Sequence, residues 1–283
     1  MSIEAPEAHI LSEQMDKELR NKKLKTVSLR DYQKLQRIGF INKNISSFDN
    51  LKAHSIESVV SRGNLILARF ENGMNLLLGP EYGGKILYHA EKATAPKKFH
   101  LKLDFEDGTC LTVTLTGMGV IKALRDSDLK DDYVYKRDFS TVASPLSDEE
   151  FTARSFIERL RGRTVNIKSV LVGKEAVVVG LSNSAFQDVI HRAKIHPKKK
   201  VSDLSMDERR ALFEAIRSMI RERLKLGGKD QFVNLYGKPG HYTPTMEPGL
   251  KDKPCKTCGT QIEKISMGGG QVFFCPECQK QPK

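Results

Sequence analysis

The sequence predicts an α+β fold with an N-terminal β-sandwich preceded by a helix, a helical second half and a four-cysteine zinc-ribbon hairpin at the end. Three observations lead to this prediction. Apolar runs separated by turn signals fill residues 55–115, apolar residues at helical spacing occur on both sides of that region, and four of the five cysteines crowd the C-terminus. A chain of 283 residues is also long enough for two apolar cores.

The first expected element is a helix that begins near Pro6. Proline suits the first helical turn because no helix hydrogen bond is lost there. The apolar residues that follow recur at three- and four-residue intervals, the spacing of one helical face: Ala8, Leu11, Met15 and Leu19.

Residues 55–115 predict strands joined by hairpins. Runs such as SVVSRGNLILARF and NLLLG are interrupted by ENG at 71–73 and DG at 107–108, which are typical of tight turns. Several hairpins in succession indicate a sandwich or barrel. Cys110 lies within this pattern, and we expect it to be a small buried apolar residue.

The second half has helical patterning after a polar linker, STVASP, at 140–145. Residues 147–150 have the form of a capping box and predict a helix start. A second capping box at 205–208 opens a longer helix that should end at Gly227-Gly228. Its apolar stripe consists of Leu212, Ile216, Ile220 and Leu224.

A segment rich in Gly, Pro and Lys from 237 to 253 leads into the cysteine cluster. Together with the linker, it divides the chain into three expected domains. These are an N-terminal sandwich over 1–139, a helical domain over 140–248 and a metal-bound finger over 249–283.

The strongest local signal is the pattern Cys255-x2-Cys258-x16-Cys275-x2-Cys278. Two thiolate pairs on tight knuckles supply four soft ligands in tetrahedral geometry, which favours one structural Zn²⁺. Residues 261–266 and 271–274 could form a hairpin between the pairs, and zinc would supply most of its folding energy. An iron–sulfur cluster is the alternative, which the long interval between the pairs disfavours.

The charge balance favours a polyanionic partner. Lys and Arg number 47 against 35 acidic residues, a formal net charge of +12. The sequence MSIEAPEAHI does not resemble a secretory signal, and no run of about 18 apolar residues predicts a membrane span. We therefore expect a cytoplasmic, nucleoid-associated protein, a monomer with no membrane partner.

Three separated segments carry a resemblance to a known family. IEAPEA at 3–8, GLSN at 180–183 followed by AKIHP at 193–197, and FCPECQ at 274–279 occur in this order. They resemble the N-terminal catalytic motif, the helix–two-turn–helix and the C-terminal zinc finger of the formamidopyrimidine-DNA glycosylase and endonuclease VIII family. The resemblance implies a DNA-repair glycosylase that acts on a damaged or modified base flipped from double-stranded DNA.

Members of that family attack the sugar C1′ with an N-terminal amine, form a Schiff base and then cut the strand. The resemblance implies that Glu4 is the general acid/base beside the sugar oxygen. The family's N-terminal proline aligns with Ile3, so removal of Met1 would leave the free amine on Ser2. That displaces the amine by about 3.5 Å, and attack geometry is sensitive to about 1 Å. The strand-cutting lyase step should therefore suffer more than base hydrolysis by water.

The resemblance also implies contacts to DNA. Arg62 and Asn64 align with a phosphate-binding Arg-Arg-Gly-Lys segment, in which Asn64 replaces the lysine. Asn183 occupies the position of the phosphate-binding asparagine of the helix–two-turn–helix. In the finger, the family's loop arginine aligns with the glycine before Gln271, which makes Gln271 a candidate. Lys264 is a candidate cation that could replace the missing charge.

Alternatives remain at this stage. Glu4 could be an ordinary carboxylate near a helix start, and Asn183 a turn residue. Loss of the proline, the lysine and the arginine is compatible with a catalytically degenerate binder of lesions or abasic sites. A third interpretation is a zinc-ribbon transcription or RNA-associated protein with an unrelated N-terminal half. Lys198 to Lys200 are further candidates for phosphate contacts.

Overall fold

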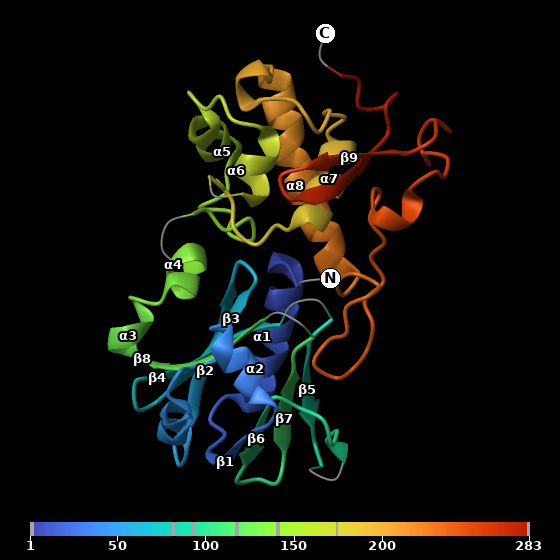
Figure 1. Cartoon of the computed structure of the whole chain (residues 1–283). Helices are drawn as coiled ribbons and strands as arrows, with labels where there is room; N and C mark the ends of the chain where they lie inside the picture. The colour runs from blue at the N-terminus through green and yellow to red at the C-terminus, as the bar shows by residue number, and fades with distance from the viewer. Residues whose placement is uncertain are drawn as a thin grey trace. The chain divides into compact units, whose positions relative to one another are not determined.

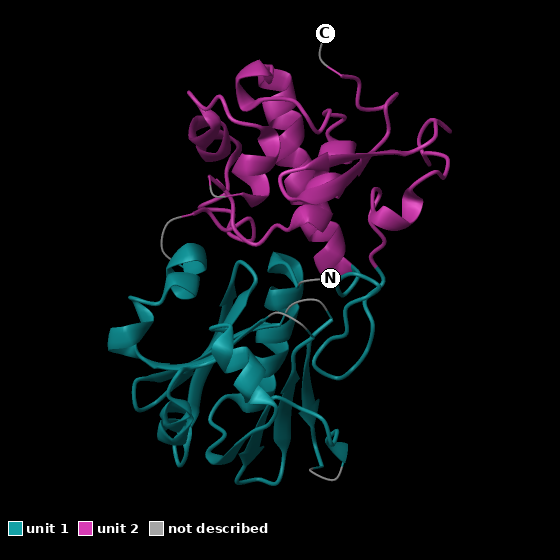
Figure 2. Ribbon diagram, viewed as in Figure 1, with its two compact units in different colours: residues 1–141, 226–241 teal, residues 142–225, 242–283 magenta. Residues whose placement is uncertain are grey.

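The computed structural model describes residues 3–80, 83–91, 94–116, 119–139, 142–173 and 175–281. The chain forms two compact units, shown in teal and magenta in Figure 2. Unit 1 comprises residues 1–141 and 226–241, and unit 2 comprises residues 142–225 and 242–283. Each unit therefore contains two separate stretches of the chain.

Helix α1 (Ala5–Leu19) opens unit 1 and confirms the predicted leading helix (Figure 1). Glu4 is its N-cap residue, and Pro6 lies in the first turn as expected. The four residues of the predicted apolar face are at most 1% exposed: Ala8, Leu11, Met15 and Leu19. Burial of that face fixes the rotation of the helix, and with it the direction of the residues at its N-terminus.

Two four-stranded sheets form the predicted sandwich. One has the order β1-β6-β7-β5 and the other β2-β3-β4-β8. The strands are β1 (Leu24–Leu29), β2 (Ile56–Arg62), β3 (Leu65–Phe70), β4 (Met74–Pro80), β5 (Lys85–His89), β6 (Leu101–Phe105), β7 (Cys110–Thr114) and β8 (Gly119–Arg125). All neighbouring strands within these sheets are antiparallel.

Both predicted turns join adjacent strands. Gly73 lies between β3 and β4, and Gly108 between β6 and β7, each with a positive φ that glycine adopts without steric cost. Cys110 is fully buried in β7, as predicted. One continuous core joins α1 to both sheets and contains Leu11, Leu76 and Leu103.

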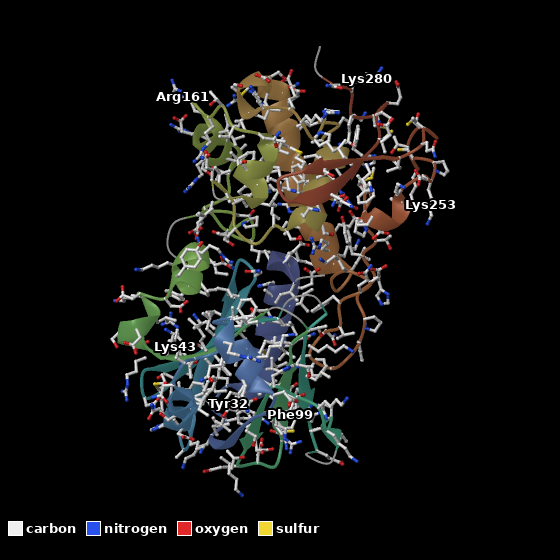
Figure 3. All side chains as sticks on the ribbon, viewed as in Figure 1. Tyr32, Lys43, Phe99, Arg161, Lys253 and Lys280 are labelled. Carbon is white, nitrogen blue, oxygen red and sulfur yellow. The ribbon has the colours of Figure 1, made fainter. Side chains whose placement is uncertain are left out.

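Short elements complete unit 1. They are α2 (Tyr32–Arg37), the 3-10 helix η1 (Ile45–Leu51), α3 (Asp126–Leu129) and α4 (Tyr133–Phe139). Figure 3 labels Tyr32 on α2 and Phe99, whose ring lies 4.8 Å from the Arg30 guanidinium carbon. This cation–π contact involves the residue that directly follows β1.

Unit 2 is helical, with α5 (Ala153–Leu160), α6 (Ile167–Val172), α7 (Asn183–Arg192), α8 (Met206–Lys225) and the short 3-10 helices η3 (Val201–Asp203) and η4 (Pro248–Leu250). The second predicted capping box is confirmed, because Ser205 N donates to Glu208 Oε2 at 2.9 Å and Glu208 N donates to Ser205 Oγ at 3.2 Å. Gly227 and Gly228 follow α8 with positive φ. None of the described helices has the length and apolar character needed to cross a membrane.

The first capping box was wrong as a helix start. Residues 147–150 form a turn, in which Glu150 N donates to Ser147 Oγ at 3.2 Å. The Glu150 carboxylate instead accepts from Ser144 N at 3.0 Å, so it bonds to a residue that precedes the motif. Helix α5 begins later, where Thr152 caps the backbone N–H of Ser155 at 3.1 Å.

The compact units divide the chain differently from the expected boundaries at 139 and 248. Residues 226–241 join unit 1 because Phe232 and Leu235 are buried in its core. The finger and the helices form unit 2 together. The expected boundaries treated each domain as one continuous stretch of sequence. They therefore could not include a segment that follows α8 and returns to the sandwich of unit 1.

The finger contains the predicted hairpin. Strands β9 (Glu263–Met267) and β10 (Gly270–Phe274) are antiparallel, and Gly268 and Gly269 form the turn with positive φ. Val272, Phe273 and Phe274 are buried, so β10 is the strand that packs against the rest of unit 2.

The hairpin between β2 and β3 generates a stability prediction. Gly63 has φ +60°, and an added Cβ would collide with the Asp138 carboxylate. Gly39 also has a positive φ but nothing within 4 Å of an added Cβ. Gly39→Ala should therefore cost about 1 kcal/mol for the backbone alone, and Gly63→Ala about 1–3 kcal/mol more from overpacking. Urea denaturation followed by circular dichroism measures both, and equal losses would contradict this packing.

Candidate functional site

Four cysteine sulfurs form a compact ligand set in unit 2. The Sγ atoms of Cys255, Cys258, Cys275 and Cys278 all lie within 4.8 Å of one another. The pairs Cys258–Cys275 and Cys255–Cys278 are 3.4 Å and 3.9 Å apart. A tetrahedral zinc site with Zn–S bonds of about 2.3 Å requires sulfur separations of about 3.8 Å. The four residues therefore fit one Zn²⁺.

The electrostatics of the cluster also require a cation. Burial, together with hydrogen bonding to neighbouring cysteines, raises the pKa of Cys278 above its ordinary value, and burial raises the pKa of Cys275. Four thiolates at this spacing repel one another unless a positive charge lies between them. Zn²⁺ supplies that charge and holds the ligands as thiolates. No protein ligand position is left open, which is typical of a structural rather than a catalytic zinc.

A histidine that sequence analysis did not single out supports this cluster. His191, in α7, has Nε2 at 3.7 Å from Cys255 Sγ and Nδ1 at 3.0 Å from Thr245 Oγ1. Burial lowers the pKa of His191 and favours the neutral ring. A neutral histidine between a hydroxyl and a metal-bound sulfur orients the ligand, as outer partners of metal sites do.

Two glutamines tie the finger to the helices of unit 2. Gln279 accepts from Cys275 N at 3.0 Å and donates to the Ile195 carbonyl at 2.8 Å. Gln187 accepts from Phe273 N at 2.8 Å. His196 packs edge-on against Phe274 and accepts from Lys198 N at 3.2 Å, so it has a structural role in this turn. The finger is therefore fixed to α7 and to the turn after it.

A buried carboxylate lies at the N-terminus of α1. Glu4 is only 1% exposed, and its Oε2 lies 2.9 Å from Lys229 Nζ, whose side chain is 3% exposed. Lys229 belongs to the segment that follows α8 and returns to unit 1. A buried carboxylate requires such a partner, because an isolated charge out of water is very costly.

A second carboxylate braces this pair. Glu7, fully buried, accepts from Glu4 N at 3.1 Å and from Lys229 N at 3.1 Å. It thus fixes the backbones of both partners while Glu4 holds the ammonium. Gly228 allows this approach, because an added Cβ would lie 3.3 Å from Glu7 Cγ and closer still to the Phe232 ring.

A small pocket in unit 1 adjoins the pair. Its lining includes Ile3, Glu7, Lys229 and Phe232, together with residues before and within β5. Ser2, the other expected catalytic residue, lies outside the described residues. The structure thus combines a buried carboxylate, an amine and a concave surface, which is a common arrangement of acid–base sites.

The residues expected to bind phosphate in the sandwich lie around the β2–β3 turn. Arg62 Nε donates to the Asp138 carbonyl at 2.8 Å, and Asn64 N donates to Asp138 Oδ2 at 3.1 Å. The side chain of Asn64 accepts from Arg137 Nη2 at 2.7 Å. Arg137, which is 45% exposed, therefore brings a guanidinium to the position that lacks the expected lysine.

A second polar group surrounds the tip of the finger hairpin. Asn183 Nδ2 donates to the Gln271 carbonyl at 2.9 Å, and Lys168 Nζ donates to the Met267 carbonyl at 2.7 Å. Gly270 lies between them, since an added Cβ would be 3.6 Å from Lys168 Nζ and 3.9 Å from Asn183 Nδ2. Burial lowers the pKa of Lys168, so a nearby anion would stabilise its charged form.

The other expected cations are less organised. Lys264 is exposed on β9, and the Gln271 side chain is exposed on β10. Lys199 is paired with Glu208 at 2.5 Å, whereas Lys198 and Lys200 are exposed. The structure brings together Asn183 and the backbone of Gln271 but provides no shared site for the remaining candidates among the described residues.

Three functional candidates were missed in the sequence: Lys229, Lys168 and Arg137. Each lies far along the chain from the group that it contacts, so no local spacing marks it. The sequence signal for Lys229 is its position directly after the Gly227-Gly228 helix end. A single charged residue directly after a helix end is only a weak indication of a buried partner.

Comparison with protein families gives three matches along the chain. Residues 3–116 match the formamidopyrimidine-DNA glycosylase N-terminal domain, and residues 142–233 match the formamidopyrimidine-DNA glycosylase H2TH domain. Residues 252–281 match a zinc finger found in that glycosylase and in IleRS. The first match begins at Ile3, which supports the alignment used for Glu4. It also excludes an unrelated N-terminal half.

Curated relatives and solved structures extend the comparison. The formamidopyrimidine-DNA glycosylase of Bacillus cereus (strain ATCC 14579) is 30% identical over 233 residues, covering 81% of this chain and 82% of the relative. That of Lactococcus lactis subsp. cremoris is 26% identical, covering 84% and 88%. The structure of Lactococcus lactis Fpg in complex with abasic-site DNA has a TM-score of 0.83 at 23% identity, over 98% of this chain and 100% of that chain. MutM from Thermus thermophilus has a TM-score of 0.81 at 22% identity, over 99% and 100%.

The thiolate cluster generates a prediction about metal content. Cys275→Ser should lose most of the bound zinc and the hairpin order, because serine is a poor ligand and the β9–β10 hairpin has little core of its own. Cys110→Ala is the matched control, since Cys110 is buried in β7 and should not affect zinc. Elemental analysis of purified variants measures the metal. Unchanged zinc in Cys275→Ser would contradict the four-thiolate site.

Proposed function

The chain belongs to the formamidopyrimidine-DNA glycosylase family, and we propose that it is a DNA-repair glycosylase that excises a damaged or modified base flipped out of double-stranded DNA. The observation that carries this proposal is the buried Glu4 carboxylate, placed at the start of α1 beside an amine and a pocket. A binding module would gain little from a charge that is so costly to bury.

In this proposal Glu4 handles the proton during base removal. The bond that breaks joins the sugar C1′ to a ring nitrogen of the base. Glu4 donates a proton to the sugar ring oxygen or accepts one from the attacking water, and either transfer needs a carboxyl group in direct reach of the sugar. The backbone hydrogen bond from Glu4 N to Glu7 holds the residue in place, so little reorganisation accompanies the transfer.

Phosphate contacts are proposed for both units. In unit 2, the ammonium of Lys168 has three donors and Met267 uses one, so the group can also bind a phosphate at the hairpin tip. Asn183 can donate its second amide proton there. Gly270, which aligns with the family's finger arginine, leaves room for that phosphate. In unit 1, Arg137 supplies the charge beside Asn64.

The second candidate function is a catalytically degenerate binder of damaged or abasic DNA. Two observations favour it: Lys229 is already paired with the Glu4 carboxylate, and Ile3 replaces the proline. A binder would retain the phosphate contacts and lose base release. We further propose a monomer that associates with the nucleoid, which light scattering and fluorescence microscopy would test.

The acid–base proposal predicts the effect of Glu4→Gln. Base release from lesion-containing duplexes should fall about 10²–10⁴-fold, because the amide cannot exchange a proton in this role. Cleavage of abasic products by hot alkali measures the release. Glu18→Gln is the matched control, since Glu18 accepts from Tyr236 OH at 2.7 Å and also joins α1 to the returning segment.

That control should retain base release and DNA affinity. If both variants lose activity equally, with matching thermal stability and zinc content, Glu4 has no special chemical role. If the unaltered chain releases no base from a wide panel of lesions yet binds abasic DNA, the binder replaces the glycosylase.

The phosphate proposal predicts the effect of Lys168→Met. Affinity for abasic-site DNA should fall, and the slope of log K against log salt should decrease by about 0.9, the value for one phosphate contact. Lys280→Met is the control, because Lys280 is exposed and paired with Glu277 at 2.9 Å (Figure 3). Fluorescence anisotropy over a salt series gives both slopes, and an unchanged slope for Lys168→Met would refute the contact.

A further inference from the structure

We propose that Lys229 supplies the amine that bonds covalently to C1′ of an abasic sugar, the role that Ile3 leaves open. The inference rests on the proposed function, because it requires an abasic site bound beside Glu4. Nothing in the sequence pattern of the family assigns a nucleophile to this segment. The assignment comes from the position of the side chain.

Ile3 cannot act as the nucleophile itself. Its nitrogen is a peptide amide, preceded by Ser2, and an amide nitrogen lacks a free electron pair for attack. Its side chain is 6% exposed and belongs to the core of unit 1. Any amine that reaches the sugar must therefore come from another residue.

Lys229 brings a primary amine to the same carboxylate. Its Nζ lies 2.9 Å from Glu4 Oε2, and the residue lines the pocket together with Ile3 and Glu7. A sugar that is positioned for proton exchange with Glu4 is thereby also within reach of this amine. Proximity of this kind replaces an encounter in solution with a fixed arrangement of reacting groups.

The segment that bears Lys229 is held firmly against α1. Lys229 N donates to Glu7 Oε1 at 3.1 Å, and Leu235 N donates to Gln14 Oε1 at 3.0 Å. Tyr236 adds the hydrogen bond to Glu18. Three successive acceptors along one helix therefore fix the backbone that positions the amine.

The pair can supply both reactive forms at once. One proton is shared between an ammonium and a carboxylate, and transfer to Glu4 leaves a neutral amine beside a carboxylic acid. The neutral amine is the nucleophile, and the acid is the proton donor.

The covalent step conserves atoms and electrons. Neutral Lys229 Nζ adds to the C1′ aldehyde carbon of the ring-opened abasic sugar. The carbonyl oxygen takes one proton from the attacking nitrogen and one from the Glu4 carboxylic acid, and it leaves as water, forming an iminium. Removal of a C2′ proton by the Glu4 carboxylate then breaks the C3′–O3′ bond, and the phosphate leaves with the electron pair. No oxidant, reductant or metal is needed.

A purely structural ion pair is the alternative. Buried pairs contribute little net stability compared with apolar residues of similar volume, and here one member of the pair, Lys229, also lines a pocket with Ile3 and Glu7. Chemistry at the pocket explains that position, whereas stability alone does not.

Borohydride trapping on abasic-site DNA tests the inference, with peptide mass spectrometry to locate the reduced adduct on the unaltered chain. We expect the adduct on Lys229. Lys229→Arg keeps the positive charge but cannot form an iminium, so it should abolish the adduct and the alkali-independent strand cut. Lys122→Arg is the matched control, because Lys122 also forms a shielded pair, with Asp132 at 2.6 Å. It should retain the adduct.

The outcomes distinguish failure of the Lys229 role from failure of the proposed glycosylase activity. An adduct on the N-terminal amine or on Lys85, which also lines the pocket, overturns the role of Lys229 and leaves the glycosylase intact. Base release without any adduct also overturns the role of Lys229 and leaves the glycosylase intact, with water as the nucleophile. Neither adduct nor base release, with abasic DNA still bound, overturns both proposals. Matching thermal stability and zinc content of the two arginine variants shows that loss of the adduct is chemical.

Discussion

The structure of unit 1 depends on satisfying the charge of Glu4 inside the protein. A carboxylate that is 1% exposed must have a partner of opposite charge and fixed hydrogen bonds, or it would not be buried at all. Lys229 provides the charge and Glu7 fixes both backbones. The pair therefore ties the start of α1 to residues 226–241, whose Phe232 and Leu235 are buried in the core of unit 1. The same contacts also assemble the candidate site.

The finger likewise depends on polar contacts for its order, but a thiolate cluster takes the place of the ion pair. The β9–β10 hairpin is too small to bury a core, so its order relies on the four thiolates and on anchors such as Gln279 and Gln187. Those anchors carry the hairpin tip to Lys168 and Asn183. In the proposed phosphate site, a bound zinc would act indirectly, because the hairpin that it holds presents a backbone loop to polar side chains from α6 and α7.

Much of the fold follows from local sequence patterns. The face of α1, the glycine turns at 73 and 108, the capping box at 205–208 and the cysteine knuckles depend on residues within a few positions of one another, and each was predicted. The predicted helix start at 147–150 was wrong because the Glu150 carboxylate accepts a hydrogen bond from Ser144 N, which a four-residue motif does not reveal. Lys229 and Arg137 escaped notice because their partners lie more than seventy residues away. Only the tertiary structure brings such charges together, whereas the position of Glu4 could be inferred from a motif.

Our central claim is that Glu4 and Lys229 together face the sugar during catalysis. The most direct test is a crystal structure of the chain with duplex DNA that contains a stable abasic-site analogue. We predict Lys229 Nζ at about 3–3.5 Å from C1′ of the analogue, with a Glu4 oxygen at hydrogen-bond distance from the sugar. A structure in which the sugar lies beside the N-terminal amine, with the Glu4–Lys229 pair intact and out of reach, would contradict it.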